Sequence, residues 1–446
     1  MPGLLYRQRD RNHNLNRLWF AQSISLVGLQ VGSIAVPLLA VDVLHASASQ
    51  VALIVTVSTV PWLVLGPVVG ALADRRDRRR LLIASHVGRG VLWLTIPAAY
   101  LAGVLTITQL LLVSVLVGVL GIVFEVSYHA FLPNIVSKAE LGSANGKMSG
   151  TDAVARSAGP AVAGYLIDLI TAPLTVVVQA VTSLLAAAST ATIRVGTRPQ
   201  PLQPPEMAEV AGSPSRRSAG WRAWWDDIRT GFSCLWQIRP LRWLTIAEAS
   251  YLFFFTLGFA VIVVFLRSTV GLDAASIGLM FSAGSIAGLL GAVLAARLSA
   301  RFGLTRTLRG AAIARGAGLA LLPVSLLVPA HTAIVVLILA RAVNAGAWSV
   351  YEVLANSYQQ ATLPDRHRGS ATAAGLWLGR STETVGAASA AALAATVNLT
   401  LLIAAAGIGA TVSGFLTLLA NPHDPEPAQP TPDAPPGEEA PSDRSR

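Results

Sequence analysis

Charged side chains stand inside otherwise apolar stretches of this sequence. A charge at the centre of a lipid bilayer costs about 3 kcal/mol even on lenient scales, so such residues mark ion paths, proton relays or ligand sites. Burial and a neighbouring arginine shift the pKa of a carboxyl group in opposite directions, so a carboxylate there can be tuned to exchange a proton. Three carboxylates, Glu125, Glu352 and Asp42, are therefore candidates for carrying a proton. Other ionisable residues of these stretches include Arg89, Arg156, Glu248, Arg315, Arg341, Arg380 and Glu383.

The composition indicates that membrane-spanning helices hold these residues. The chain is 53% hydrophobic and 13% charged, whereas soluble domains carry about 25% charged residues. A spanning helix needs about 20 apolar residues, and the strands of a membrane barrel would alternate over about 10 residues, which these continuous runs do not. Apolar segments occur at residues 18–40, 50–72, 82–102, 108–130, 148–168, 172–193, 243–266, 275–296, 308–329, 332–358, 369–396 and 399–420. The predicted fold is an all-α integral membrane protein with twelve transmembrane helices.

The second half of the chain repeats landmarks of the first half. Gln22 and Glu248 head corresponding apolar segments, and Val123-Phe124-Glu125-Val126 returns as Val350-Tyr351-Glu352-Val353. Further matched pairs are Leu72-Ala73-Asp74-Arg75 with Leu298-Ser299-Ala300-Arg301, Arg89-Gly90 with Arg315-Gly316, and Gly142-Ser143 with Gly369-Ser370. One class of secondary transporter builds a midplane binding site from such tandem repeats. The pattern therefore predicts two pseudo-symmetric six-helix halves.

The predicted organisation has five parts. Residues 1–16 form a cytoplasmic arm, 17–194 the first half and 241–420 the second half. Residues 195–240 form a cytoplasmic linker that starts Pro- and Ser-rich and ends in an amphipathic helix, which we expect to lie in the membrane interface. Residues 421–446 are Pro-rich and acidic and are expected to be a disordered tail.

Arginines are concentrated in alternate loops. The loop at 75–80, the stretch 194–239 and the short loops after the even-numbered segments are rich in Arg or Lys, whereas the other loops hold essentially Arg267. Because loops rich in Arg and Lys stay in the cytoplasm, we expect both termini to be cytoplasmic. Nearly all of the cations are Arg, which suggests a GC-rich bacterial genome, so the expected location is a bacterial cytoplasmic membrane. This asymmetry also explains the net charge of +10. The cations form no single stripe, which argues against nucleic-acid binding.

The loop after the second segment reads GALADRRDRRR at residues 70–80. Asp74 can interact favourably with a helix N-terminus, and the arginines can pair with loop carboxylates or with anionic lipid. We interpret the loop as a charged latch that holds the cytoplasmic side closed in one state; the alternative is a topology signal alone. The latch residues are Gly70, Leu72, Asp74, Arg75, Arg78 and Arg79.

This loop resembles the hallmark G-x-L-a-D-R-x-G-R-R of the major facilitator superfamily, although Asp77 stands where that family usually has glycine. The resemblance covers residues 15–420 and implies transport by alternating access. In the fifth segment, Gly159, Pro160 and Gly164 resemble the glycine-proline motif of the family's drug–proton antiporters. Proline can bend a helix and small residues permit close helix contact. The wider pattern, including residues 364–370, looks most like the branch that contains the enterobactin exporter and macrolide efflux proteins.

The resemblance also implies which residues meet the substrate, because in this family segments 1, 4, 7 and 10 line the cavity. Aromatic and amide groups there suit a bulky amphipathic organic compound; packing or lipid contact is the alternative. Arg89 and Arg315 are expected to be structural partners on other segments. The substrate-cavity candidates are Gln22, Glu248, Arg341, Asn344, Trp348, Tyr351, Arg156 and Glu383.

Other functions find no support in the sequence. Cys234 is the only cysteine, so neither an internal disulfide nor a cysteine metal cluster is expected. No nucleotide-binding loop and no hydrolase motif occurs, so we expect no cofactor, no metal and no enzyme activity. The favoured hypothesis is a monomeric exporter of a drug, siderophore or secondary metabolite, in antiport with protons and in contact with membrane lipid. The alternatives are a proton-coupled uptake symporter and a transporter-like membrane sensor.

Overall fold

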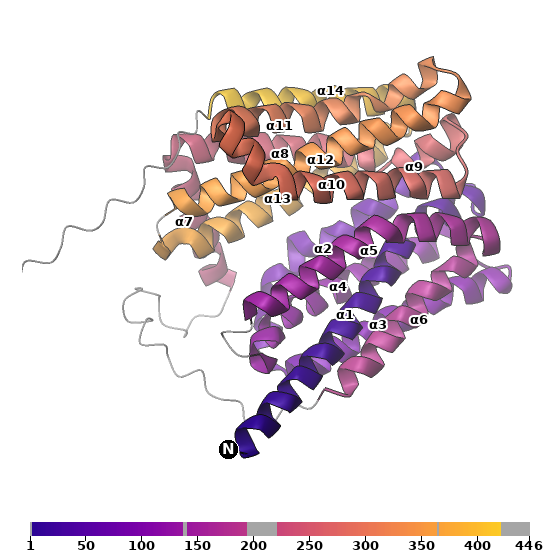
Figure 1. Cartoon of the computed structure of the whole chain (residues 1–446). Helices are drawn as coiled ribbons and strands as arrows, with labels where there is room; N and C mark the ends of the chain where they lie inside the picture. Colours follow the sequence, from indigo (N-terminus) through magenta and orange to yellow (C-terminus); the bar gives the residue numbers. More distant parts are fainter. Residues whose placement is uncertain (1, 137–140, 194–220, 364, 421–446) are drawn as a thin grey trace, which may run out of the picture.

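The computed structural model describes residues 2–136, 141–193, 221–363 and 365–420. The first half of the chain forms one group of mutually packed helices, coloured indigo to magenta in Figure 1. These helices are α1 (Pro2–Asp42), α2 (Ala48–Arg75), α3 (Arg78–Leu101), α4 (Ile107–Ile135), α5 (Leu141–Ile170) and α6 (Ala172–Ala191).

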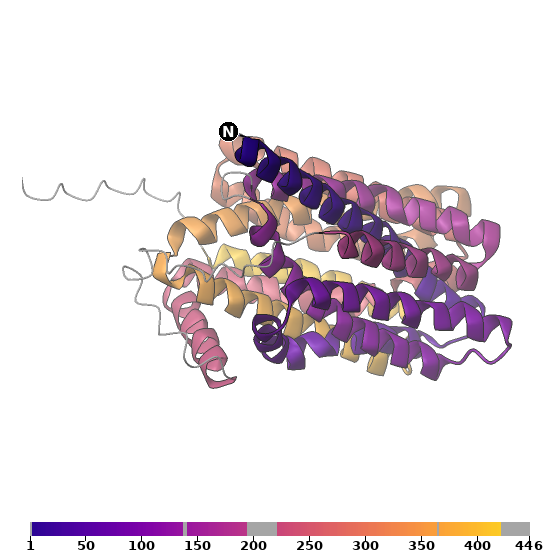
Figure 2. The ribbon, with the colours of Figure 1, turned by 90° about the horizontal axis from the view of Figure 1, so that it is seen from below.

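The second half forms another helical group beside the first, as Figures 1 and 2 both show. It contains α7 (Trp221–Gln237), α8 (Arg239–Phe259), α9 (Ile262–Val264), η2 (Phe265–Thr269), α10 (Ala274–Phe302), α11 (Leu304–Ala320), η3 (Leu322–Leu327), α12 (Ala330–Thr362), α13 (Asp365–Leu393), α14 (Leu399–Phe415) and η4 (Leu416–Leu418). Both ends of the described chain lie at the same end of the molecule (Figure 1). We call this the terminal end and the other the distal end.

Side-chain caps define where several helices begin. Asp77 accepts hydrogen bonds from the backbone N–H groups of Arg79 and Arg80 at the start of α3, and Thr106 caps α4. Asp273 accepts the N–H of Ser276 at the start of α10, and hydrogen bonds from Ser276 lower the pKa of the Asp273 carboxyl group. These caps satisfy backbone donors that a helix leaves unpaired at its N-terminus.

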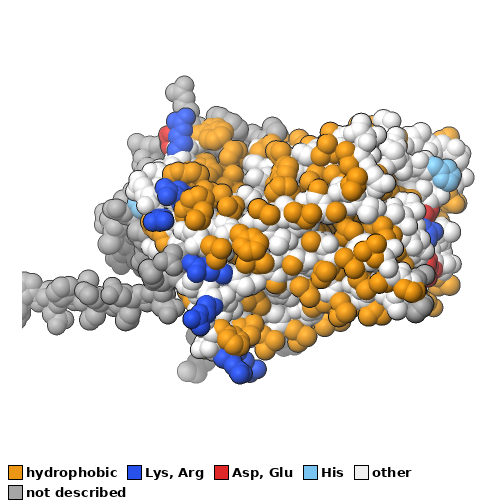
Figure 3. Space-filling model, turned by 90° about the horizontal axis from the view of Figure 1, so that it is seen from above, with side chains coloured by type: hydrophobic (Ala, Val, Ile, Leu, Met, Phe, Trp, Pro, Cys, Tyr) orange, Lys and Arg blue, Asp and Glu red, His pale blue; other side chains and the backbone are white. Residues whose placement is uncertain are grey.

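The outer surface is apolar between two polar ends. Large hydrophobic side chains such as Leu112, Val293 and Leu327 are exposed, whereas water-soluble proteins rarely expose extensive apolar patches. In Figure 3, Lys and Arg side chains gather toward the terminal end, next to an outer face where hydrophobic side chains are widespread. This surface suits contact with lipid, with the backbone polar groups satisfied inside the helices.

Eight helices of the described residues are long and apolar enough to cross a membrane, fewer than the twelve expected. The segments that do not qualify lie in α2, α5, α11 and α13. Helix α11 has 17 residues and continues as the 3₁₀ turn η3, while α5 and α13 are rich in small and polar residues. The all-helical membrane architecture is therefore confirmed, and the exact number of crossings is not.

The amphipathic linker helix forms as α7, but its surroundings differ from the expectation. Its apolar face packs on α13: the rings of Trp225 and Phe232 lie 5.5 and 6.2 Å from that of Trp377. At Gly231 the backbone comes so close to the Ser370 carbonyl that a Cβ atom would clash. Protein therefore covers much of the face that we expected to meet lipid, although Trp236 stays exposed.

Candidate functional site

A cavity of about 470 Å³ lies at the inner wall of the second half. Its wall comes from α8, α12 and α13, together with Arg156 of α5 from the first half. Three carboxylates line it, Glu248, Glu352 and Glu383, one from each of the three wall helices. Each carboxylate has a different set of partners, and these sets decide what it can do.

Glu248 forms an ion pair with a fully buried arginine. Its Oε2 atom accepts a hydrogen bond from Nη1 of Arg315 at 2.6 Å, and the Glu248 side chain remains 29% exposed. The Arg315 guanidinium lies 3.7 Å from the ring centre of Tyr251 and 3.8 Å from that of Tyr351. Contacts of this kind between a desolvated cation and aromatic rings contribute about 2 kcal/mol each. The pair therefore joins the cavity wall to the interior of the second half.

Asn344 connects this pair to a second arginine. Its Nδ2 atom donates to the Tyr251 hydroxyl at 3.0 Å and to the Arg315 carbonyl at 2.7 Å, and its Oδ1 accepts from Arg341. Arg341 also lies over the ring of Phe281, at 5.7 Å. Among the described residues, Arg341 makes no ion pair, and the ion pair of Glu248 is with Arg315. Protonation of Glu248 would leave the buried Arg315 guanidinium without its counter-charge, which makes this residue a poor proton carrier.

The described partners of Glu352 are neutral. Its two oxygens accept hydrogen bonds from the indole N–H of Trp348 at 3.1 Å and from the amide of Asn356 at 3.2 Å. Within the described part of the chain it makes no ion pair, and its side chain faces the cavity. The ring of Trp348 lies 5.5 Å from that of Phe255 on α8.

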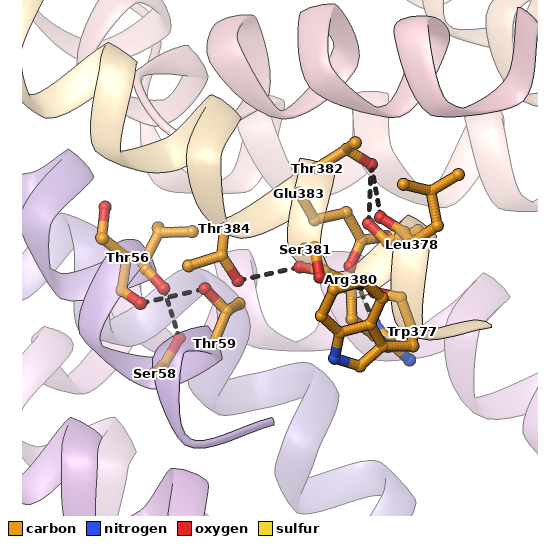
Figure 4. A network of polar contacts seen from close by, with 12 residues as sticks. Thr56, Ser58, Thr59, Trp377, Leu378, Arg380, Ser381, Thr382, Glu383 and Thr384 are labelled. Carbon is orange, nitrogen blue, oxygen red and sulfur yellow. Dashed lines mark hydrogen bonds and ion pairs between the residues drawn. The ribbon is translucent and has the colours of Figure 1, made fainter. Parts of the chain in front are cut away.

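Glu383 pairs with Arg380 on its own helix, at 3.0 Å. Arg380 also lies 5.5 Å from the ring of Trp62, which brings α13 against α2 of the first half. Figure 4 shows hydroxyl side chains of α2 and of α13, the latter next to Arg380 and Glu383. Those of Thr56, Ser58, Thr59, Ser381, Thr382 and Thr384 donate to carbonyl groups of their own helices. These bonds would survive a separation of α2 from α13.

Polar contacts between the halves close the distal end. Asp42 pairs with Arg267 at 2.9 Å, and Asp168 accepts the backbone N–H of Ala275 at 2.9 Å. Ser49 at the start of α2 donates to the Ala391 carbonyl near the end of α13. Asp42 therefore lies outside the cavity lining, in a contact between the halves.

The glycine-proline motif of α5 lies against α10. A Cβ atom at Gly164 would clash with the Ala274 carbonyl, and one at Gly278 would clash with the Pro160 carbonyl. Gly159 faces α1 instead, where a Cβ atom would lie 2.5 Å from Cβ of Gln30. The motif thus permits close backbone contact, and part of that contact joins the two halves.

The latch loop is described only in part. Gly70, Leu72, Asp74 and Arg75 lie in α2, but their side chains fall outside the described residues. Arg79 donates to the carbonyl groups of Thr190 and Ala191 at the end of α6, so it satisfies orphan acceptors of a helix C-terminus within its own half. Arg78 lies in the first turn of α3.

The predicted site residues of the first half are scattered. Glu125 is exposed, is not in the cavity wall, and makes no ion pair with another described residue. Arg156 reaches the cavity but pairs with Asp152 on its own helix at 2.7 Å. Gln22 lies in α1, and its Oε1 atom is buried without a hydrogen-bond partner.

Sequence reasoning missed Tyr251, and it gave Arg315 only a structural role. Arg315 is the partner of a cavity carboxylate, and Tyr251 covers one face of its guanidinium. The repeat of Arg89 and Arg315 was the available signal, because a charge kept at matching places in both halves must have a local partner. Nothing in the sequence marked Tyr251, which has Ser25 at the matching place.

The model of the Major Facilitator Superfamily matches residues 18–374 and, in a second match, 244–443. The chain belongs to the major facilitator superfamily. It is 31% identical over 153 residues to the Uncharacterized MFS-type transporter YfiS of Bacillus subtilis (strain 168), a match that covers 34% of this chain and 36% of that relative. The chain therefore spans about a third of the length of the curated relative it matches.

Solved structures with the same fold cover nearly the whole chain. A bacterial homologue of the iron transporter ferroportin in its inward-facing state matches with a TM-score of 0.68 at 15% identity, over 92% of this chain and 98% of that one. The same homologue in its outward-facing state gives 0.55 at 16% identity, over 91% and 99%. The nucleoside transporter NupG gives 0.64 at 12% identity, over 92% and 99%. These likenesses concern the fold.

Family membership settles the general class of this protein. It is a multi-pass membrane protein of a transporter family, not of an enzyme family.

Proposed function

We propose that this transporter exports a small organic molecule by alternating access, in antiport with protons. The observation that carries the proposal is a cavity whose carboxylate Glu352 makes no ion pair with any described residue, in a molecule whose halves are joined at the distal end. A cavity that opens at one end at a time is the structural basis of alternating access. On the resemblance of α5 and of residues 364–370, we place the chain in the enterobactin exporter and macrolide efflux branch.

We propose that both termini are cytoplasmic, in a bacterial inner membrane, and that the protein is a monomer. Arg297, Arg301 and Arg306 lie around the turn between α10 and α11, and Lys and Arg gather at that end in Figure 3. In this orientation the cavity faces the cytoplasm, in keeping with the better match to an inward-facing relative. A reporter active only in the periplasm, fused after Arg446, should stay silent; activity there would reverse the orientation.

The proposed unit of movement is a six-helix half, at 17–194 or 241–420. The latch residues and the contact of Gly159, Pro160 and Gly164 would control the two ends of the cavity. Asp42 lies in the contact between the halves that joins their distal ends, so its proposed role is to stabilise the state that is closed there.

Proton exchange is proposed at Glu352. Glu248 is paired with Arg315 and Glu383 with Arg380, whereas Glu352 can gain or lose a proton without breaking an ion pair to any described residue. Arg341, Asn344 and Tyr351 then hold the frame around the site. Glu125 remains the alternative carrier.

The direction of transport is tested in energised membrane vesicles. We suggest a cationic, a neutral and an anionic dye in parallel: ethidium, Nile red and carboxyfluorescein. Export predicts proton-driven accumulation of at least one dye in inverted vesicles, and loss of accumulation when a protonophore collapses the gradient. Accumulation only in right-side-out vesicles would establish the uptake symporter, and binding without movement in either orientation would favour the sensor.

A further inference from the structure

Most charges around the cavity cancel in local pairs. The pairs are Glu248 with Arg315 at 2.6 Å, Glu383 with Arg380 at 3.0 Å, and Arg156 with Asp152 at 2.7 Å. Among the described residues, Glu352 is the carboxylate of the cavity wall that no arginine or lysine balances. The cavity therefore presents a negative charge to whatever enters it.

The local geometry leaves room for a further partner of Glu352. A carboxylate offers about four lone-pair positions, and the N–H groups of Trp348 and Asn356 occupy two of them. Both donors are neutral, so they orient the carboxylate without removing its charge. A cationic group in the cavity would supply the charge balance that the protein lacks at this position.

Trp348 adds a second recognition element beside that charge. It lies four residues before Glu352 on α12, one helical turn away, and both side chains line the cavity. Its ring lies 5.5 Å from that of Phe255, and the apolar side chains of Leu252 and Leu376 also line the cavity. An indole face attracts cations and also packs against hydrocarbon.

Among the described charged residues that line the cavity, Arg368 is the remaining one, and it lies at the rim. It donates Nε to the Leu363 carbonyl at 3.2 Å, beyond the end of α12. Between Glu352 and that helix end the axis rises by about 15 Å. At this separation Arg368 does not replace a counter-ion in contact with Glu352. The interior of the cavity and its rim are thus electrostatically different.

We infer that the transported molecule is an amphipathic organic cation, with its charge on the Glu352 carboxylate and its apolar part against Trp348. This inference rests on the proposed function and narrows its substrate class. The volume of about 470 Å³ falls within the usual range for sites of drug-sized ligands, about 300–1,000 Å³. The binding charge is also the proposed proton site, so cation and proton would exclude one another there.

The test uses the purified full-length protein in detergent and two probes of matched size and opposite charge. Radiolabelled tetraphenylphosphonium should bind, and tetraphenylborate should not displace it. Glu352→Gln should weaken binding of the cation about tenfold or more, while the charge-preserving Glu352→Asp should stay within about threefold of wild type. Trp348→Leu should weaken binding about threefold, and Trp348→Phe should weaken it less.

A matched control removes a carboxylate away from the cavity. Asp226 is exposed on α7, so Asp226→Asn makes the same change of charge and should leave the affinity for tetraphenylphosphonium unchanged. Equal thermal unfolding midpoints for all variants exclude misfolding as the cause of a loss. Unchanged binding in Glu352→Gln, or displacement by tetraphenylborate, would overturn the inference.

The dye experiment separates this inference from the proposed function. If Nile red or carboxyfluorescein is exported and tetraphenylphosphonium does not bind, export stands and the cationic substrate class is wrong. If tetraphenylphosphonium binds through Glu352 but no dye moves in either type of vesicle, the site stands and export is wrong.

Discussion

Arg89 and Arg315 occupy matching places in the two halves, in very different environments. Arg89 donates to the Ser25 hydroxyl at 3.1 Å, contacts a ring nitrogen of His86 at 3.2 Å and lies 5.0 Å from the ring of Phe124. Arg315 instead pairs with Glu248 and lies between two tyrosine rings. At matching positions the first half has Gln22, Ser25 and Phe124 where the second has Glu248, Tyr251 and Tyr351.

The difference shows how a repeated frame acquires one asymmetric site. Both halves keep an arginine at the matching place, Arg89 on α3 and Arg315 on α11. The described cavity, however, is walled almost entirely by the second half. Three differences at matching positions create the ion pair and its aromatic surroundings at the cavity wall. The second half has Glu248 where the first has Gln22, Tyr251 where the first has Ser25, and Tyr351 where the first has Phe124. The helices set where the site lies, and these substitutions set its charge.

The largest effect is expected at the matched carboxylates Glu352 and Glu125. Glu352→Gln should abolish proton-driven export, because glutamine keeps the size and the hydrogen bonds of glutamate but cannot carry a proton. Glu125→Gln should retain transport, because Glu125 is not in the cavity wall. Proton-driven flux in proteoliposomes, with thermal stability measured in parallel, decides between them. Normal flux in Glu352→Gln with loss in Glu125→Gln would move the coupling site to the first half.

The second prediction concerns stability and compares Glu248 with Gln22. Glu248→Gln should lower the free energy of unfolding by about 3–5 kcal/mol, because it leaves the buried Arg315 without its counter-charge. Gln22→Ala should cost far less, since the Gln22 Oε1 atom has no hydrogen-bond partner to lose. Thermal unfolding in detergent measures both changes. If Glu248→Gln, Arg315→Gln and the double variant are all equally stable, the pair is not a structural lock.

The third prediction compares the latch loop with its counterpart in the second half, residues 298–301. Asp74→Asn should slow transport about fivefold or more, at the lower end of usual coupling energies, while the protein still inserts. In the second half Ala300 stands at the matching position, so Ala300→Asp should have little effect on transport. Flux per inserted molecule is the measurement. A wild-type rate in Asp74→Asn would reduce the loop to a topology signal.

The sequence predicted the helical fold because only helices and closed barrels satisfy all of their backbone hydrogen bonds in lipid. Long apolar runs, the repeat and the loop at 70–80 led to the family and to the all-helical membrane fold. The span count was less accessible, since α5 and α13 contain small and polar residues that hydropathy alone undervalues. The contact of α7 with α13 was missed because an apolar helix face does not reveal whether lipid or protein covers it.

The partners of the site residues could be predicted only in part. Residue type marked Glu248 and Arg315 as costly inside a membrane, but their pairing depends on how α8 packs near α11. Asp42 and Glu352 looked alike in sequence; in the structure Asp42 pairs with Arg267 of the other half, whereas Glu352 pairs with no cation among the described residues. Long-range packing determines that distinction, and no local pattern encodes it.

The smallest expected effect comes from giving the first half the acid of the second. Gln22→Glu places a carboxylate where Glu248 would be, within reach of Arg89 if the repeat holds at side-chain level. Two terms oppose each other: the carboxylate loses hydration, and Arg89, whose Nε atom is buried without a partner, gains a counter-charge. Such terms nearly cancel for buried pairs, and Arg89 already has Ser25 and His86, so we expect a gain of at most about 1 kcal/mol.

The same substitution with Arg89→Gln should instead destabilise the protein, because the new carboxylate then has no cation. A double-mutant cycle from thermal unfolding measures the coupling between the two positions. Zero coupling would mean that the halves share a backbone frame but not side-chain geometry, and a large gain would mean that the asymmetry is maintained at a cost in stability.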